Sequence, residues 1–395
     1  MAATVRPNAR AGHTATVIPY REEREAILVL GGFDGENVLP LDESYVFLPS
    51  MERWEPMPTT SMPPQPRAMH AAAMMNNTLV VHGGWGGIDL LRRDTCLLHL
   101  TDSQSQWEAP SQRLALVATP SARQGHSLLA APAEADERQL ASSGIEPHQP
   151  ELLLFGGDTG DDVSGELWSL TVTPDGQQLV WKLLGAREAH GKPPSARTGH
   201  TALILPTAGT GVAPGGHMLI FGGRAADGRT FNDMFLFSIG GRRWSKPRVS
   251  GDVPRPRWAC ACCVLPSGGP RGPRLLVDGG RDTDGWVVDG SQMLVDIHFV
   301  DAAEARRRQS MQPRAFERKS PSPDQESDDG SSSNGGGGGG GGGGGFRLDS
   351  ARRSASPRRA PSPRGPVRAQ SPFRAPPEEH ASRTPPKKAR SLECV

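Results

Sequence analysis

Short apolar runs that end in paired glycines recur five times between residues 28 and 280. The runs occupy residues 28–32, 79–84, 152–157, 219–223 and 275–280. An alternating apolar segment follows each of the first four, at 44–48, 96–100, 167–170 and 234–237. Short apolar runs bounded by glycine and proline are typical of β-strands. The pattern therefore predicts an all-β fold made of repeated units.

Two further residue patterns recur together with the glycine pairs. An arginine precedes each pair and opens a four-residue phrase that ends in histidine or cysteine: Arg10 to His13, Arg67 to His70, Arg123 to His126, Arg197 to His200 and Arg257 to Cys260. In the first four units a tryptophan follows the second glycine by 21 to 24 residues, namely Trp54, Trp107, Trp181 and Trp244. Each unit holds about four strands and cannot bury its faces alone, so the units are expected to pack around an axis.

This combination of paired glycines, a preceding arginine and a following tryptophan resembles the Kelch-repeat β-propeller family. The resemblance covers roughly residues 10 to 300 and implies a propeller of about five four-stranded blades, within a domain of residues 1–305. The fifth unit lacks the tryptophan, and we expect residues 3–5 or the stretch after Val300 to supply its missing strand. The chain is expected to be monomeric unless the propeller edge stays open, because an open edge invites pairing.

Residues 306–395 form a second region, rich in Arg, Ser, Pro and Gly, which includes a glycine run at 335–345. Such a composition cannot bury enough apolar surface to offset its ordering entropy, so this tail is predicted to be disordered. It carries a net charge of +9, which leaves −8 for residues 1–305. The whole-chain net charge of +1 is therefore the sum of two opposite charges, and it excludes no class of partner.

The tail also carries two regulatory patterns. Six hydroxyl residues precede proline and are predicted sites for a proline-directed kinase: Ser320, Ser322, Ser356, Ser362, Ser371 and Thr384. A basic cluster with Lys387, Lys388 and Arg390 resembles a nuclear-import signal. We therefore expect a cytoplasmic or nuclear protein, or both. The tail's aromatic residues are few, so no specific nucleic-acid recognition is expected.

The turns that follow the glycine pairs are the candidate binding site. In a four-stranded meander, the turn between the second and third strands and the links between blades share one face. We call this the recognition face; its post-glycine segments are 33–40, 85–94, 158–165, 224–231 and 281–289. Trp and Arg are enriched among binding hot spots. The candidate residues mix aromatic rings with both charge signs and are Trp85, Arg92, Arg93, Asp158, Asp161, Asp162, Arg224, Arg229, Arg281, Asp284 and Trp286.

Other residue patterns favour structural roles over chemistry. The recurring histidines His13, His70, His126 and His200 fall in different blades, so we interpret them as strand-end residues bonded to nearby backbone, with no metal bound. The cluster Cys260, Cys262 and Cys263 lacks a second ligand pair and is interpreted as part of an ordinary strand. No catalytic motif is visible, and neither an enzyme activity nor a cofactor is expected.

The sequence favours a protein-interaction adaptor or scaffold that binds an unidentified protein through the recognition face. One alternative is a propeller enzyme or a metal-assisted specifier protein with its site near the axis. Another is a nuclear, phosphorylation-regulated factor that binds through the tail. No window reaches the roughly 18 to 20 apolar residues of a membrane span, so no membrane association is expected.

Overall fold

The computed structural model describes eleven stretches of the chain. They are residues 6–34, 40–101, 105–108, 118–132, 150–173, 178–205, 216–252, 254–269, 272–286, 288 and 292–298. All of them belong to one compact unit, Met1–Met311. The predictions made for 306–395, including the phosphorylation sites and the import signal, lie outside these described residues. No helix in the described stretches is long and apolar enough to cross a membrane.

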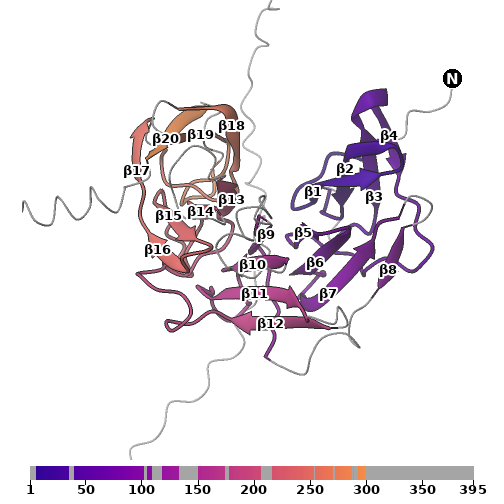
Figure 1. Ribbon diagram of the computed structural model, residues 1–395, viewed down its shortest axis with the longest axis horizontal. Coiled ribbons are helices and arrows are strands. Elements are labelled where there is room, and N and C mark those ends of the chain that lie inside the picture. The colour runs from indigo at the N-terminus through magenta and orange to yellow at the C-terminus, as the bar shows by residue number, and fades with distance from the viewer. Residues whose placement is uncertain are drawn as a thin grey trace, which may run out of the picture. The chain divides into compact units, whose positions relative to one another are not determined.

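The described strands form five four-stranded antiparallel sheets, which confirms the predicted five-bladed propeller (Figure 1). The first sheet contains β1 (Thr14–Tyr20), β2 (Glu23–Leu30), β3 (Ser44–Leu48) and β4 (Arg53–Pro56), with a 3-10 turn, η1 (Pro49–Met51), before β4. The second contains β5 (Ala71–Met75), β6 (Thr78–Trp85), β7 (Leu91–His99) and β8 (Gln106–Glu108). In both, neighbouring strands in the sheet are also neighbours in the chain.

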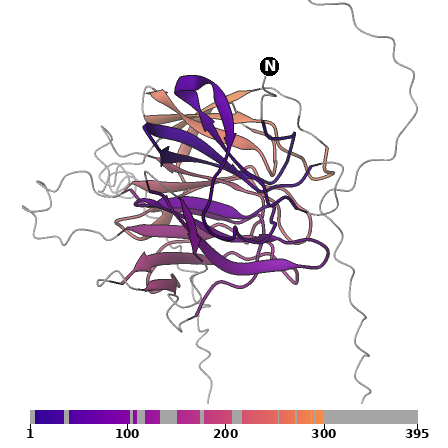
Figure 2. The ribbon, with the colours of Figure 1, turned by 90° about the vertical axis from the view of Figure 1, so that its right-hand side faces the viewer.

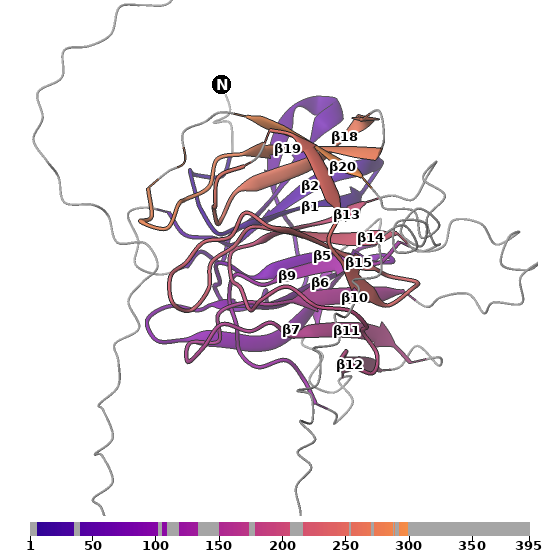
Figure 3. The same cartoon turned by 90° about the vertical axis from the view of Figure 1, so that its left-hand side faces the viewer.

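The third and fourth sheets repeat this order. The third contains β9 (Ser127–Ala130), β10 (Glu151–Phe155), β11 (Leu167–Val172) and β12 (Leu179–Leu183). The fourth contains β13 (Thr201–Leu205), β14 (His217–Phe221), β15 (Met234–Ser238) and β16 (Arg243–Ser245). The strands lie along similar axes and alternate in direction, so the connecting turns gather at two opposite ends (Figure 3).

The fifth sheet corrects the prediction about its missing strand. It contains β17 (Arg248–Gly251), β18 (Ala261–Gly269), β19 (Gly272–Asp278) and β20 (Met293–His298), in the order β17-β20-β19-β18. The outermost place is taken by β17, which pairs antiparallel with β20. Neither residues 3–5 nor the stretch after Val300 is needed for this strand, because the segment directly after β16 supplies it.

Apolar side chains from successive sheets form the core. Each central strand presents alternate residues to the two neighbouring blades. In the first junction, Leu28 and Val46 pack with Leu79 and Leu98, all of them at most 1% exposed. Similar clusters fill the next three junctions. Each fully buried leucine contributes on the order of 1.5 to 3 kcal/mol, so the blades depend on one another for stability.

The innermost strands β1, β5, β9, β13 and β18 contact one another in that order around the axis. A backbone ladder reinforces these contacts. The amide of Met69 donates to Gly12 O at 2.6 Å, Gly125 to Met69 O at 2.9 Å, Gly199 to Gly125 O at 2.8 Å, and Ala259 to Gly199 O at 2.7 Å. Within the described stretches, no contact of similar extent joins β18 to β1.

Candidate partner-binding face

The recurring arginines anchor the turns that lead to the recognition face. Arg67, Arg123, Arg197 and Arg257 are buried, each residue being at most 1% exposed. Each donates Nη1 to the carbonyl of the first glycine of its own blade, at 2.8–3.1 Å, and Arg10 makes the same bond to Gly31 at 3.1 Å. A charged group survives burial only when it is bonded in this way. The arginines are therefore structural and are not available to a partner.

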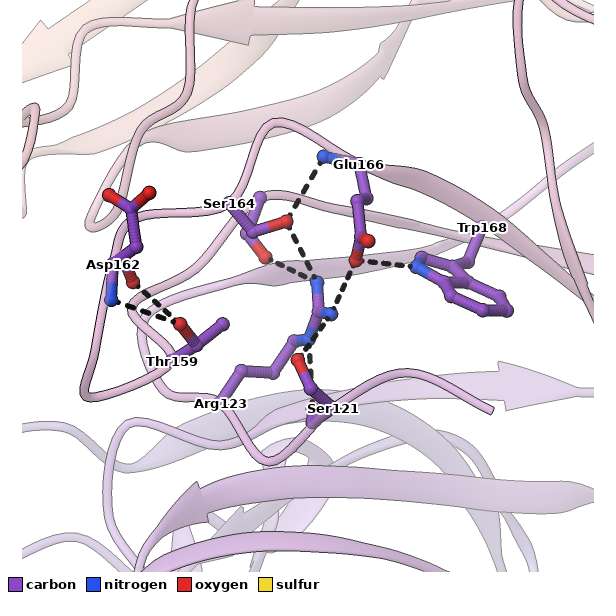
Figure 4. Close-up of polar contacts among 8 residues, drawn as sticks. Ser121, Arg123, Thr159, Asp162, Ser164, Glu166 and Trp168 are labelled. Carbon is purple, nitrogen blue, oxygen red and sulfur yellow. Dashed lines mark hydrogen bonds and ion pairs between the residues drawn. The ribbon is translucent and has the colours of Figure 1, made fainter. Parts of the chain in front are cut away.

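Figure 4 shows this arrangement in the third blade. Arg123 donates to the carboxylate of Glu166 at 2.7 Å and to the hydroxyl of Ser121 at 3.0 Å. The same Glu166 oxygen accepts the indole N–H of Trp168 at 3.0 Å, and the Ser164 hydroxyl accepts the backbone amide of Glu166 at 3.1 Å. These donors lower the pKa of Glu166 although its partial burial acts to raise it. The turn that carries Ser164 and Glu166 is therefore bonded to the buried guanidinium of Arg123.

A short backbone bridge fixes the base of every post-glycine segment. The residue after the second glycine pairs with the residue after the arginine of the same blade: Phe33 with Ala11, Trp85 with Ala68, Asp158 with Gln124, Arg224 with Thr198, and Arg281 with Trp258. Four of the eleven candidate binding residues stand at this position, namely Trp85, Asp158, Arg224 and Arg281. Each is half-buried, because the bridge holds its backbone against the blade.

The side chains at these bridge positions have intramolecular partners. Asp158 accepts from the side-chain amide of Gln124 at 3.1 Å and from the amide of Gly160 at 2.8 Å. Arg224 lies over the ring of Trp258, with 5.7 Å to its centroid. Arg92, on β7, is half-buried and donates to Pro66 O at 3.1 Å. These candidate residues therefore brace the turns in which they lie.

The remaining candidates are exposed; Arg93 lies at the start of β7 and the others lie further along the same turns. They are Arg93, Asp161, Asp162, Arg229, Asp284 and Trp286. Trp286 is 64% exposed, a large fraction for a tryptophan, and its backbone is held because its amide donates to Asp282 Oδ1 at 2.9 Å. The exposed surface therefore combines both charge signs with an aromatic ring on a fixed backbone.

Two exposed apolar residues of the recognition face escaped the sequence prediction. Ile88 is 73% exposed and Leu90 is 46% exposed, and both lie in the turn between β6 and β7. Sequence reasoning selected aromatic and charged residues and treated aliphatic ones as core. One signal in the sequence could have identified them. Ile88 and Leu90 lie beside Gly86, Gly87 and Asp89, which are turn residues, and outside the alternating apolar segments.

Neighbouring turns of this face also contact each other. The hydroxyls of Thr230 and Thr283 share a hydrogen bond of 2.7 Å between the fourth and fifth blades. Between the second and third blades, a Cβ at Gly160 would lie 3.3 Å from Leu91 Cδ1. Contacts of this kind limit the motion of the turns, so a partner would meet a largely preformed surface.

The repeated histidines serve the blade junctions, although their partners differ from the prediction. Nε2 of His70 bonds to the hydroxyl of Thr14 in the preceding blade, and Nε2 of His200 bonds to that of Ser127, each at 2.9 Å. The partners are side chains, whereas backbone was expected. Burial lowers the pKa of His70 and of His200 to about 3. No group of three metal-ligating residues exists among the described residues.

Cys260 takes the histidine place in the fifth blade. Its Sγ lies 3.4 Å from the hydroxyl of Thr201 in the fourth blade, so it continues the junction contacts. Cys262 and Cys263 lie in β18 and face opposite sides of the sheet. Cys262 packs beside the apolar cluster of the fourth junction, as the strand interpretation of the sequence implies.

Comparisons with known proteins agree with this architecture. A family model described as the KLHDC2/KLHL20/DRC7 Kelch-repeats domain matches residues 2–134 and 132–326. Adagio-like protein 1 of Oryza sativa subsp. japonica is 27% identical over 310 residues, which cover 76% of this chain and 42% of that protein. An F-box/kelch-repeat protein of Arabidopsis thaliana is 26% identical over 249 residues, which cover 59% of this chain and 44% of that protein.

A solved structure of YjhT matches the fold, with a TM-score of 0.50 and 15% sequence identity over 73% of this chain and 84% of that one. At this identity the likeness concerns the fold alone. The chain spans about two fifths of the length of the curated relatives named above. Their whole-protein activities therefore do not transfer to it directly.

Proposed function

The chain belongs to the KLHDC2/KLHL20/DRC7 Kelch-repeats domain family, and from this premise we propose that it is a protein-interaction adaptor that captures a protein partner on the recognition face. The observation that carries the proposal is the exposure of Trp286 and Ile88 on turns whose bases are bonded to buried arginines. Apolar side chains held on a fixed backbone are suited to anchor a protein interface.

The charges around these anchors support a protein partner of mixed charge. Arg93 and Arg229 contribute positive charge, and Asp161 and Asp284 negative charge, all of it exposed. A surface with both signs is suited to orient a folded partner, since complementary pairs steer encounter and disfavour wrong registers. The name of one relative, an F-box/kelch-repeat protein, is consistent with a recognition module that works beside other domains.

Proximity labelling from the intact chain tests the proposal. We expect a Trp286→Ala, Ile88→Ser double variant to lose the partner that the native chain labels. The matched control is Leu183→Ser on the outer strand β12, which removes an exposed apolar side chain, 44% exposed, away from the post-glycine turns. Equal labelling by the native chain and the double variant would contradict the proposed face. A purified chain that carries one equivalent of iron, copper or zinc would instead support the metal-dependent alternative.

A further inference from the structure

Two free thiols lie side by side at the fourth junction. Cys260 directly precedes β18, and Cys262 is the second residue of that strand. Residues two apart in an extended chain point to the same face of a sheet, and both cysteines pack beside the apolar cluster between the fourth and fifth blades. Figure 2 shows the fifth blade in orange, where the described chain ends. The two sulfurs are near enough to share a hydrogen bond.

Hydrogen bonds favour the thiolate form of Cys260. The Cys262 thiol donates to the Cys260 sulfur, and the hydroxyl of Thr201 lies 3.4 Å from that sulfur. These two contacts and the nearby guanidinium of Arg257 hold the pKa of Cys260 below its ordinary value, although burial acts to raise it. The bond that Cys262 donates, together with burial, raises the pKa of Cys262. Cys260 is therefore the better nucleophile of the pair.

The other described cysteines do not combine these features. Cys96 is buried, and burial raises its pKa to about 12. Cys263 is exposed, but it lies on the opposite face of β18, so its side chain points away from Cys260 and Cys262. Cys260 and Cys262 are both partly exposed. Cysteines that respond to oxidants are accessible, form the thiolate readily and lie next to a second thiol.

We propose that Cys260 is a site of reversible oxidation by hydrogen peroxide and that Cys262 is its resolving thiol. In the first step the Cys260 thiolate attacks one peroxide oxygen, the O–O bond breaks, and the departing hydroxide is protonated to water. Cys260 is then a sulfenic acid.

The second step forms a disulfide within the pair. The Cys262 sulfur attacks the Cys260 sulfur, the S–O bond breaks, and the hydroxyl group takes the Cys262 proton and leaves as water. The two sulfurs together lose two electrons, and the peroxide is reduced to two molecules of water.

The backbone at Cys260 allows this disulfide and also makes it easy to reduce. Bridged cysteines have Cα atoms about 4.4 to 6.8 Å apart, and residues two apart in a regular strand lie at the upper end of that range, at about 6.4 to 6.8 Å. Cys260 precedes the first paired residue of β18, Ala261, and follows Ala259, whose φ is +52°. The chain leaves the extended conformation here, so Cys260 can approach Cys262 without breaking the β18 ladder. The strain that remains makes the disulfide readily reducible.

Site-resolved oxidation of the full chain tests the proposal. The reduced protein is treated with hydrogen peroxide, and mass spectrometry follows each cysteine with and without dimedone, which traps sulfenic acids. We expect the native chain to lose two hydrogen atoms from the Cys260 and Cys262 pair and to regain them with dithiothreitol. Cys260 should react at least about tenfold faster than Cys96, whose thiolate is disfavoured by burial.

Two variants separate the attacking thiol from the resolving one. In Cys262→Ser the hydroxyl keeps a hydrogen-bond donor beside Cys260 but cannot resolve its sulfenic acid, so dimedone labelling of Cys260 should rise about tenfold or more. Cys263→Ser is the matched control, because it removes the neighbouring thiol on the opposite face of β18. It should form the disulfide at the native rate.

Several outcomes would overturn the proposal. Faster oxidation of Cys263 than of Cys260 in the native chain, a comparison that needs no substitution, would mean that exposure alone sets reactivity. Equal dimedone labelling of Cys260 in the native chain and in Cys262→Ser would mean that Cys262 does not resolve it. A disulfide that is lost in Cys263→Ser, or one that joins two chains on a non-reducing gel, would mean that another thiol is the partner.

Discussion

The Nε2 atom of His70 and the hydroxyl of Thr14 share a hydrogen bond of 2.9 Å across the first blade junction. The third junction repeats it with His200 and Ser127. The second junction does not, because the residue in the position of Thr14 is Ala71. His126 is 7% exposed, and neither ring nitrogen has a hydrogen-bond partner among the described residues.

We expect Ala71→Ser to stabilise the protein by about 0.5 to 1.5 kcal/mol, because the new hydroxyl gives His126 the partner that its counterparts have. Ala73→Ser is the matched control on the same strand. Ala73 is equally buried but lies where no histidine can reach, so its hydroxyl should cost about 1 to 3 kcal/mol. Urea unfolding measures both, and a loss of stability in both variants would contradict the interpretation of the junction.

The sequence was sufficient to predict the five sheets, because the glycine pairs, arginines and tryptophans are local marks of each blade. It was insufficient for β17. That strand carries one aliphatic side chain, Val249, and its strand conformation depends on pairing with β20, which lies more than forty residues later. Strand formation depends on such non-local partners more than helix formation does.

The sequence located the turns that follow the glycine pairs but not the exposure of their side chains. Asp158 and Arg224 have the residue types of a binding site, but the backbone bridge to the arginine phrase half-buries them. Isoleucine is usually a core residue, but Ile88 lies in a turn and is exposed to solvent. Exposure is set by what packs beside a residue, and a single sequence does not contain that information.

Among the described residues, no carboxylate bonds to the buried arginine of the fifth blade, Arg257. Glu43, Asp94, Glu166 and Asp233 bond to the arginines of the first four blades, at 2.7–2.8 Å. In the first four blades the carboxylate lies opposite the first glycine, whereas in the register of β19 and β20, in which Val277 pairs with Met293, the position opposite Gly279 is 291, outside the described residues. Arg257 Nη2 lies 3.9 Å from the sulfur of Met293, a weak acceptor.

We expect Asp233→Asn to lower the free energy of unfolding by about 1 to 2 kcal/mol, because the buried guanidinium of Arg197 would lose its charged acceptor. Hydrogen bonds to charged groups contribute about 1.5 to 3 kcal/mol, and the lower end applies because the existing carboxylates are 31–46% exposed. Glu166→Gln is the same change in the third blade, beside Arg123, and should lose a similar amount. Thermal unfolding that is unchanged in both variants would refute the role of the carboxylate.

The buried histidines predict acid sensitivity that begins near neutral pH. Burial lowers the pKa of His70 and of His82 to about 3, against 6.5 for the unfolded chain. Below pH 6.5 the unfolded state therefore binds protons that the folded state excludes, and stability falls until the pH reaches about 3. Each such histidine contributes a slope of about 1.4 kcal/mol per pH unit within that window.

A His70→Gln variant isolates this effect. Glutamine retains a polar group near Thr14 but does not titrate, so the slope of unfolding free energy between pH 6 and pH 4.5 should fall by about 1.4 kcal/mol per pH unit. Above pH 6.5 the two proteins should run parallel. Urea titrations at closely spaced pH values provide the measurement. A slope that does not change on substitution would mean that His70 is protonated in the folded state.

At the first glycine of a pair, an added methyl group should cost both backbone strain and displacement of the next blade, whereas at a glycine in open space it should cost strain alone. Gly222 has a φ of +64°, and a Cβ there would lie 2.6 Å from the carbonyl of Arg257, which accepts the amide of Gly223. Gly228 has a φ of +87°, but its nearest atom is the flexible end of Arg224 at 3.4 Å. Both substitutions by alanine carry backbone strain of about 1 to 2 kcal/mol. Only Gly222→Ala must also displace the next blade, so we expect it to cost about 3 kcal/mol or more. Chemical denaturation that gives equal losses for the two variants would show that the junction yields freely and that the glycine pair does not hold the blades in register.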